Sequence, residues 1–289
     1  MTADVVPLEA YRRFYAEEIE AIANIRNPAI VDALAAVPRE RFLAPGPWVF
    51  RSEIDFGGPA RQTTDADPRR VYHNVVIGIE PERQLFNGAP GVIAPCMDAL
   101  ECRAGLRVLH VGCGLGYYTA VLAQIVGARG RVVAIEVDAR LVGRARDNLE
   151  PWSHVEVRHG DGTDLGGELF DAILVNAGTT HPHEAWLNAM APGARMVVPL
   201  TATIPQMGPI GKGFFVLFSD VGKGVFSARV ITMVAIYSAE RVRDDMLNAR
   251  LAKALMRGIF PKIKTLRRDP HEETTSCWLH GDAFCLSAD

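Results

Sequence analysis

The sequence lacks several features that mark particular classes of protein. No apolar run is long enough to cross a membrane, and the first residues lack the basic and apolar regions of a secretory signal. A formal net charge of −3 leaves no excess of positive charge for nucleic acid. The five cysteines include no Cys-x-x-Cys pair, a pattern typical of free thiols in a reducing compartment. We therefore predict a cytoplasmic protein that has neither membrane nor nucleic acid as a partner.

A recognised metal-binding pattern is also missing. His271, Cys277, His280 and Cys285 lie close together in the sequence, but their spacing matches no familiar zinc motif. A role within a loop or the core is the simpler interpretation. The sequence therefore predicts no metal site.

The middle of the chain alternates short apolar runs with helical segments. We expect helices over residues 118–126, 139–149 and 182–190, and strands over 107–111, 131–136, 155–158, 172–176 and 195–199. Apolar runs separated by helices indicate parallel strands that are covered on both faces. Two further strands, 214–218 and 225–235, are joined by a turn short enough for an antiparallel hairpin.

The flanking regions are less regular. Residues 1–100 are interpreted as a cover of helices and loops that contributes to the site where a second substrate, the acceptor, would bind. Within it we expect helices over 8–25, 28–37 and 92–100, a short strand over 72–79, and irregular segments over 45–70 and 84–91. Residues 101–236 form the predicted core. A C-terminal segment, 237–289, contains a helix over 239–256 and a tail without clear periodicity.

Three glycines follow the first core strand, and an acid ends the next strand. Gly112, Gly114 and Gly116 allow a tight turn and a close approach to a ligand, while Glu136 is placed to bind ribose hydroxyls. The pattern indicates a cofactor that contains adenosine. Its spacing is G-x-G-x-G, however, rather than the G-x-G-x-x-G of dinucleotide sites.

Two more groups of polar residues follow later strands. Asp161 and Gly162 are expected to recognise adenine, and Asn176 is expected to face the reacting end of the cofactor. Each motif also has a simpler interpretation. Gly160-Asp161-Gly162 favours an ordinary turn, and Thr180 or His181 before Pro182 resembles the start of a helix.

Four passages resemble the S-adenosylmethionine-dependent methyltransferases, and among them the protein-L-isoaspartate O-methyltransferase family. They are residues 30–43 with their Val-Pro-Arg-Glu sequence, the glycine loop 108–123, the turn 160–162 and the strand 193–199. The resemblance implies a Rossmann-like class I methyltransferase, an α/β fold with a seven-stranded, mostly parallel sheet, an antiparallel hairpin and helices on both faces. It also implies S-adenosyl-L-methionine as cofactor and carboxyl O-methylation of isoaspartyl or aspartyl residues in a protein or peptide.

The sequence departs from that family on the acceptor side. The family's serine before the glycine loop is missing from residues 83–90, and Asn87 is the best substitute polar group. His110 stands where the family has an acid, and the residues after 235 lie outside the basic family pattern. An O-methyltransferase of a small metabolite and a non-catalytic cofactor-binding domain therefore remain alternatives.

The choice of acceptor decides whether a base is needed. A carboxylate is already ionised at neutral pH, so its methylation needs alignment and exclusion of water rather than a base. A hydroxyl acceptor needs a positioned base, for which His181 is the first candidate and His73 the second. The predicted catalytic residues are accordingly Asn87 and His181.

Overall fold

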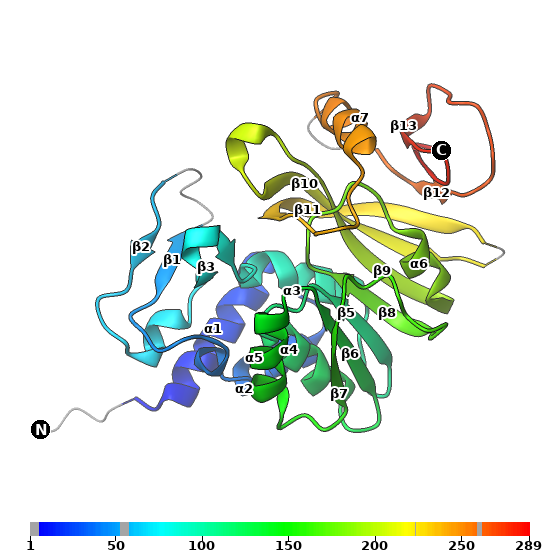
Figure 1. Cartoon of the computed structure of the whole chain (residues 1–289). Coiled ribbons are helices and arrows are strands. Elements are labelled where there is room, and N and C mark those ends of the chain that lie inside the picture. The colour runs from blue at the N-terminus through cyan, green and yellow to red at the C-terminus, as the bar shows by residue number, and fades with distance from the viewer. Residues whose placement is uncertain (1–5, 53–57, 223, 259–261) are drawn as a thin grey trace, which may run out of the picture.

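The computed structural model describes residues 6–52, 58–222, 224–258 and 262–289. Its main feature is one mixed sheet with the strand order β13-β14-β12-β11-β10-β9-β8-β5-β6-β7, and helices cover both faces of this sheet (Figure 1). The α/β class predicted from the sequence is confirmed. No helix in the described ranges is long and apolar enough to cross a membrane.

One half of the large sheet is parallel. Its strands are β5 (Arg107–Val111), β6 (Arg131–Glu136), β7 (Val155–His159), β8 (Phe170–Val175) and β9 (Met190–Ala202). The helices between them are α4 (Tyr117–Val126), α5 (Ala139–Leu149) and α6 (Glu184–Asn188). The predicted strands 107–111 and 131–136 and the predicted helix 139–149 are confirmed residue for residue.

The other half is antiparallel and larger than predicted. β10 (Ile210–Asp220) and β11 (Phe226–Tyr237) form the expected hairpin. β12 (Thr265–Arg267), β14 (Cys285–Ser287) and β13 (Cys277–His280) then continue the sheet beyond β11. The prediction of seven mostly parallel strands is therefore wrong, because strands of three or four residues are too short to produce a periodic pattern.

The N-terminal part also contains more regular structure than predicted. Its helices are α1 (Leu8–Ala23), α2 (Pro28–Ala36) and α3 (Pro90–Ala99). A second sheet, β2-β1-β3-β4, consists of β1 (Val49–Ser52), β2 (Arg61–Gln62), β3 (Val75–Glu80) and β4 (Leu85–Phe86). The interpretation of 45–70 as irregular missed β1 and β2, because β1 pairs with β2 and with β3 through contacts between residues distant in sequence.

The core lies on both faces of the large sheet. Val108 packs into a cluster shared with α1 to α5, whereas Leu109 packs on the opposite face with α6 and α7 (Asp245–Leu255). This alternation is expected for strands buried on both sides. Apolar contacts run from α1 through the central strands to β10, across the predicted boundary at residue 100.

Candidate active site

The glycine loop connects β5 to α4 in a conformation that requires glycine. Gly112, Gly114 and Gly116 have φ values of 76°, 56° and 92°, in the left-handed region. A Cβ on Gly116 would lie 2.7 Å from Leu149 Cδ1. The loop therefore packs closely on α5, and Gly112 and Gly114 line a cavity at the carboxyl ends of the strands.

Glu136 ends β6 beside this loop and is buried, with 7% of its surface exposed. Its Oε2 accepts a hydrogen bond from Gly114 N at 2.8 Å, and its Oε1 accepts from the amides of Val137 and Asp138 at 2.9 and 3.1 Å. A carboxylate has about four acceptor positions, so Glu136 retains capacity to bind hydroxyls of a ligand.

The residues predicted to recognise adenine follow β7. Asp161 Oδ1 accepts hydrogen bonds from Thr163 N at 3.0 Å and Thr163 Oγ1 at 2.6 Å. These hydrogen bonds hold the pKa of the Asp161 carboxyl below its usual value, so it is ionised at neutral pH. Gly162 has a φ of 83°, and its carbonyl accepts from Trp186 Nε1 at 2.8 Å. Gly162 thus has a structural role, while Asp161 lines the cavity.

Asn176 follows β8 and carries a buried polar atom that has capacity for a ligand. Its backbone N–H donates to Val111 O at 2.8 Å, which fixes the residue beside the glycine loop. Its side-chain Oδ1 is buried and has no hydrogen-bond partner within the described ranges. Because buried polar atoms are almost always paired, this oxygen fits the role of an acceptor for a donor on a bound molecule.

One cavity of about 1270 Å³ joins these residues. Of the seven predicted cofactor-binding residues, five line it: Gly112, Gly114, Glu136, Asp161 and Asn176. Gly116 and Gly162 shape the backbone around it instead. The cavity lies at the carboxyl ends of the parallel strands, where α/β sheets bind ligands.

Of the predicted acceptor loop, residues 83–90, positions 83–89 line the same cavity. Asn87 Oδ1 accepts from Ile77 N at 2.8 Å and from Arg39 Nη2 at 3.4 Å, and Asn87 N donates to Ile77 O at 2.9 Å. These contacts fix the loop to β3. The described bonds of the Asn87 side chain all use Oδ1, which leaves the Nδ2 amide as the donor available to a ligand.

Arg39 holds this side of the site and was not identified from the sequence as a site residue. It is fully buried, and its Nη1 donates to the carbonyls of Val71 and His73 at 2.8 and 2.9 Å. Its Nη2 donates to Val75 O at 2.8 Å as well as to Asn87. The Val-Pro-Arg-Glu sequence is the one local signal for this residue, and it indicates the family rather than the buried contacts of Arg39.

The antiparallel hairpin contributes a third side of the cavity. Lys212 on β10 and Tyr237 on β11 line it, as does Arg51 on β1, whose guanidinium lies 5.1 Å from the centre of the Phe86 ring. No sequence motif marks these residues, because β1, β10 and β11 meet only in the folded chain.

The predicted catalytic residue His181 does not line this cavity. Gly178 and Thr179 form bridges with Ser238 and Leu200, so the chain after β8 continues along the sheet. His181 Nδ1 lies 2.9 Å from Thr180 Oγ1, and its ring stacks on Phe284 with 5.8 Å between centroids. Burial, followed by the neighbouring His183, lowers the pKa of His181.

His73, the second candidate base, is also absent from the cavity lining. None of the eight histidines in the chain contributes to that lining. A neutral imidazole base is therefore not available within the cavity.

Comparisons with known proteins agree with this geometry. The family model described as protein-L-isoaspartate(D-aspartate) O-methyltransferase (PCMT) matches residues 61–210. A protein-L-isoaspartate O-methyltransferase of Methanothrix thermoacetophila is 33% identical over 186 residues, covering 63% of this chain and 78% of that protein. A protein-L-isoaspartate O-methyltransferase 1 of Rhodopseudomonas palustris is 32% identical over 197 residues, with coverages of 66% and 69%.

Solved structures show the same fold. A protein-L-isoaspartate O-methyltransferase has a TM-score of 0.61 at 22% identity and covers 83% of this chain and 69% of its own. A Plasmodium falciparum protein in complex with S-adenosyl-L-homocysteine has a TM-score of 0.58 at 16% identity, with coverages of 80% and 98%. At these identities the likeness establishes the architecture.

Proposed function

Because the chain belongs to the protein-L-isoaspartate(D-aspartate) O-methyltransferase family, we propose that it transfers a methyl group from S-adenosyl-L-methionine to the free carboxylate of an isoaspartyl residue in a protein or peptide. The buried, unpartnered Asn176 Oδ1 and the glycine-lined hollow fit this cofactor. When bound, it supplies an electrophilic methyl group on a positively charged sulfur.

The match of residues 61–210 to the family model carries the choice of acceptor, and the absence of histidine from the cavity lining formed by the described residues agrees with it. A carboxylate is ionised at neutral pH and needs no base, whereas a hydroxyl or phenol does. Arg51 also lines this cavity, and its positive charge favours an anionic acceptor. The Asn87 Nδ2 amide, held by Arg39 and β3, is proposed to donate a hydrogen bond to that carboxylate.

The remaining residues have binding and shielding roles in this proposal. Glu136 binds the ribose hydroxyls, Asp161 accepts from the adenine amine, and Asn176 Oδ1 accepts from the cofactor's amino group. Tyr117, Tyr118 and Phe42 line the cavity with aromatic surface that excludes water. Tyr118 also donates to Gly88 O at 2.5 Å, which ties the acceptor loop to α4. Rate enhancement then comes mainly from alignment of the two reactants.

The direct test uses cofactor with a tritiated methyl group. A peptide containing one isoaspartyl residue should acquire label in a base-labile methyl ester, while the matched aspartyl peptide measures the preference between the two acceptors. Label that enters only hydroxylated small molecules would establish the metabolite alternative. Calorimetric cofactor binding without transfer to any acceptor would establish a non-catalytic binding domain.

Glu136→Ala should weaken cofactor binding about 10- to 100-fold. Charge-assisted hydrogen bonds contribute about 1.5–3 kcal/mol, and each 1.4 kcal/mol corresponds to about tenfold in Kd. Calorimetric titration measures the change, and thermal unfolding checks that the Gly114 loop remains folded. Glu240→Gln, which alters another cavity-lining carboxylate, is the matched control. Equal affinity in the wild type and the Glu136 variant would refute the placement of the ribose.

His181→Ala should retain most of the turnover on an isoaspartyl peptide. His181 lies outside the cavity, and a carboxylate acceptor has no proton to lose. Steady-state kinetics give the ratio of kcat values, with cofactor affinity measured in parallel. A fall of about 100-fold or more at unchanged affinity would restore His181 as a general base and point to a hydroxyl acceptor.

A further inference from the structure

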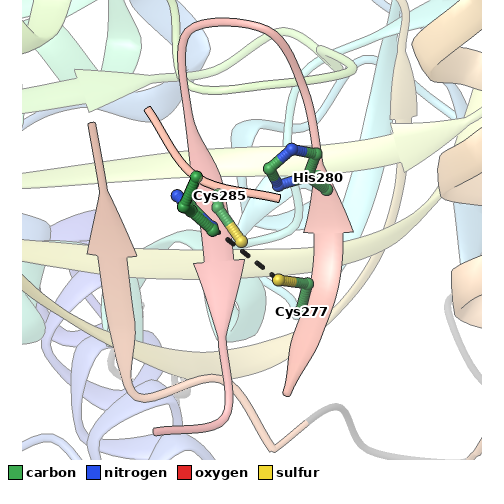
Figure 2. Close-up of side chains that lie close together, drawn as sticks. Cys277, His280 and Cys285 are labelled. Carbon is green, nitrogen blue, oxygen red and sulfur yellow. Dashed lines mark hydrogen bonds between the residues drawn. The ribbon is translucent and has the colours of Figure 1, made fainter. Parts of the chain in front are cut away.

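Four metal-binding side chains converge in the tail, outside the cofactor cavity. Cys277 and His280 lie at the two ends of β13, Cys285 begins β14, and His271 lies in the segment before β13. Figure 2 shows Cys277, His280 and Cys285 pointing toward one another from the two strands. Both cysteines are buried, and both histidines are half-buried.

An irregularity in β13 explains why the linear spacing concealed this cluster. Positions three apart on a regular strand point to opposite faces. Here Cys277 pairs with Ser287 and Leu279 with Leu286, so the register shifts by one residue at Trp278. Such a bulge brings Cys277 and His280 to the same face, where Cys285 is the direct partner of His280.

The donor atoms are close enough to share one ion. One donor atom from each of the four residues lies within 4.8 Å of the others, and Cys277 Sγ lies 3.8 Å from His271 Nε2. A tetrahedral zinc ion with bonds of about 2.0–2.3 Å places its ligands about 3.3–3.8 Å apart. Small side-chain movements toward a common centre therefore complete the coordination.

The surroundings prepare these atoms as ligands. His271 Nδ1 lies 2.8 Å from Asp269 O, a hydrogen bond that puts the proton on Nδ1 and leaves the Nε2 lone pair toward Cys277. Thr274 N donates to Cys277 Sγ at 3.3 Å, which stabilises a thiolate. His280 Nδ1 is buried and has no hydrogen-bond partner in the described part of the chain. Coordination through that nitrogen would satisfy it.

We propose that His271, Cys277, His280 and Cys285 bind one Zn²⁺ ion in a closed structural site. Two sulfur and two imidazole donors in a tetrahedral arrangement select zinc among the common divalent ions. Binding deprotonates both thiols and releases two protons to solvent, and the two thiolates balance the ion's charge. Four protein ligands leave no open position for a substrate, so the ion has no part in methyl transfer.

The ion stabilises a part of the tail that contacts the loop after β8. The turn between β13 and β14 carries Phe284, which stacks on His181. Arg268, before the cluster, donates to Asn188 and Glu184 at 2.9 and 3.0 Å. Strands of three or four residues form few ladder hydrogen bonds, so a metal cross-link adds to the core contacts of Leu266, Leu279 and Leu286.

The first measurement is the metal content of the full chain, purified without chelator or histidine tag. Elemental analysis should find about one zinc per chain, as expected for one four-ligand site. Cys277→Ser and Cys285→Ser should lose most of that zinc. Cys102→Ala, which removes a buried thiol outside the cluster, is the matched control and should keep it.

Cobalt provides a second measurement that does not depend on the variants' folding. Wild-type protein stripped of metal and loaded with Co²⁺ should show thiolate-to-cobalt charge transfer and the intense visible bands of tetrahedral coordination. A full-length chain that contains no zinc and binds neither ion on titration would overturn the proposal. So would a Cys277–Cys285 disulfide in the protein as isolated under reducing conditions. Neither result depends on the methyl acceptor.

Discussion

Arg39→Ala is expected to lower the free energy of unfolding by about 3–5 kcal/mol, because it removes several hydrogen bonds from a charged donor, at about 1.5–3 kcal/mol each, together with buried packing. The guanidinium donates to three backbone carbonyls and to Asn87, and it lies 5.9 and 5.8 Å from the ring centres of Tyr15 and Tyr117. Alanine leaves those buried carbonyls without donors and creates a cavity. Urea denaturation of wild type and variant at the same pH measures the change.

Two further variants distinguish the effect of the planar guanidinium of Arg39 from the effects of its charge and of its place on the helix. Arg39→Lys keeps the charge but provides a single ammonium in place of a planar fork, so an intermediate loss of stability is expected. Arg41 lies on the same short helix but is exposed, and among the described residues its side chain donates to Asn148 O alone, at 3.2 Å. Arg41→Ala should therefore lower stability by less than about 1 kcal/mol. An Arg39→Ala loss equal to that of Arg41→Ala would show that the buried network contributes little.

Arg39 also shows which structural features can be predicted from the sequence and which cannot. The parallel strands and α5 were predictable because their signals are local: continuous apolar runs, and an Asp138 cap that accepts from Arg140 N at 3.0 Å. The ligand-facing glycines and Glu136 followed from their positions at strand ends. Arg39 carries a motif too, but its partners lie more than thirty positions away, so its role required the folded chain.

The errors have a common cause in pairing between distant segments. The small sheet joins β1 to β3, and the tail strands extend β11, without any periodic pattern in the residues involved. His181 was placed near the cofactor from its distance along the chain after β8. The bridges of Gly178 and Thr179 to other strands turn the chain away before it reaches that residue. Local patterns identified five residues that line the cavity, but they gave no signal for Arg51, which reaches the lining through the pairing of β1 with β3.

His110 should make the folded state markedly less stable in mild acid. It is fully buried on β5, its Nδ1 lies 2.8 Å from Thr119 Oγ1, and its Nε2 is buried with no hydrogen-bond partner in the described residues. Burial lowers the pKa of His110 from 6.5 to about 3. The ring is therefore neutral in the folded protein over the whole range in which an unfolded histidine gains a proton.

The sign of the effect follows from proton binding. Between about pH 6.5 and pH 3 the unfolded chain binds one more proton than the folded chain, so stability falls as the pH falls. Each pH unit in that range changes the unfolding free energy by about 1.4 kcal/mol, which gives about 2–3 kcal/mol between pH 7 and pH 4.5. Above pH 6.5 both states are neutral at this residue and its contribution is constant.

Comparison with His110→Leu isolates this contribution from that of the carboxylates. Leucine cannot titrate, so the loss of stability between about pH 7 and pH 4.5 should be smaller in the variant by about 2–3 kcal/mol, whatever its stability at neutral pH. Urea denaturation at several pH values provides the curves. His159→Gln, which replaces an exposed histidine on β7, is the control for the loss of an imidazole outside the core. If His110→Leu followed the wild-type curve, the buried ring would have to be protonated in the folded state, and Nε2 would then need an acceptor that the described structure does not provide.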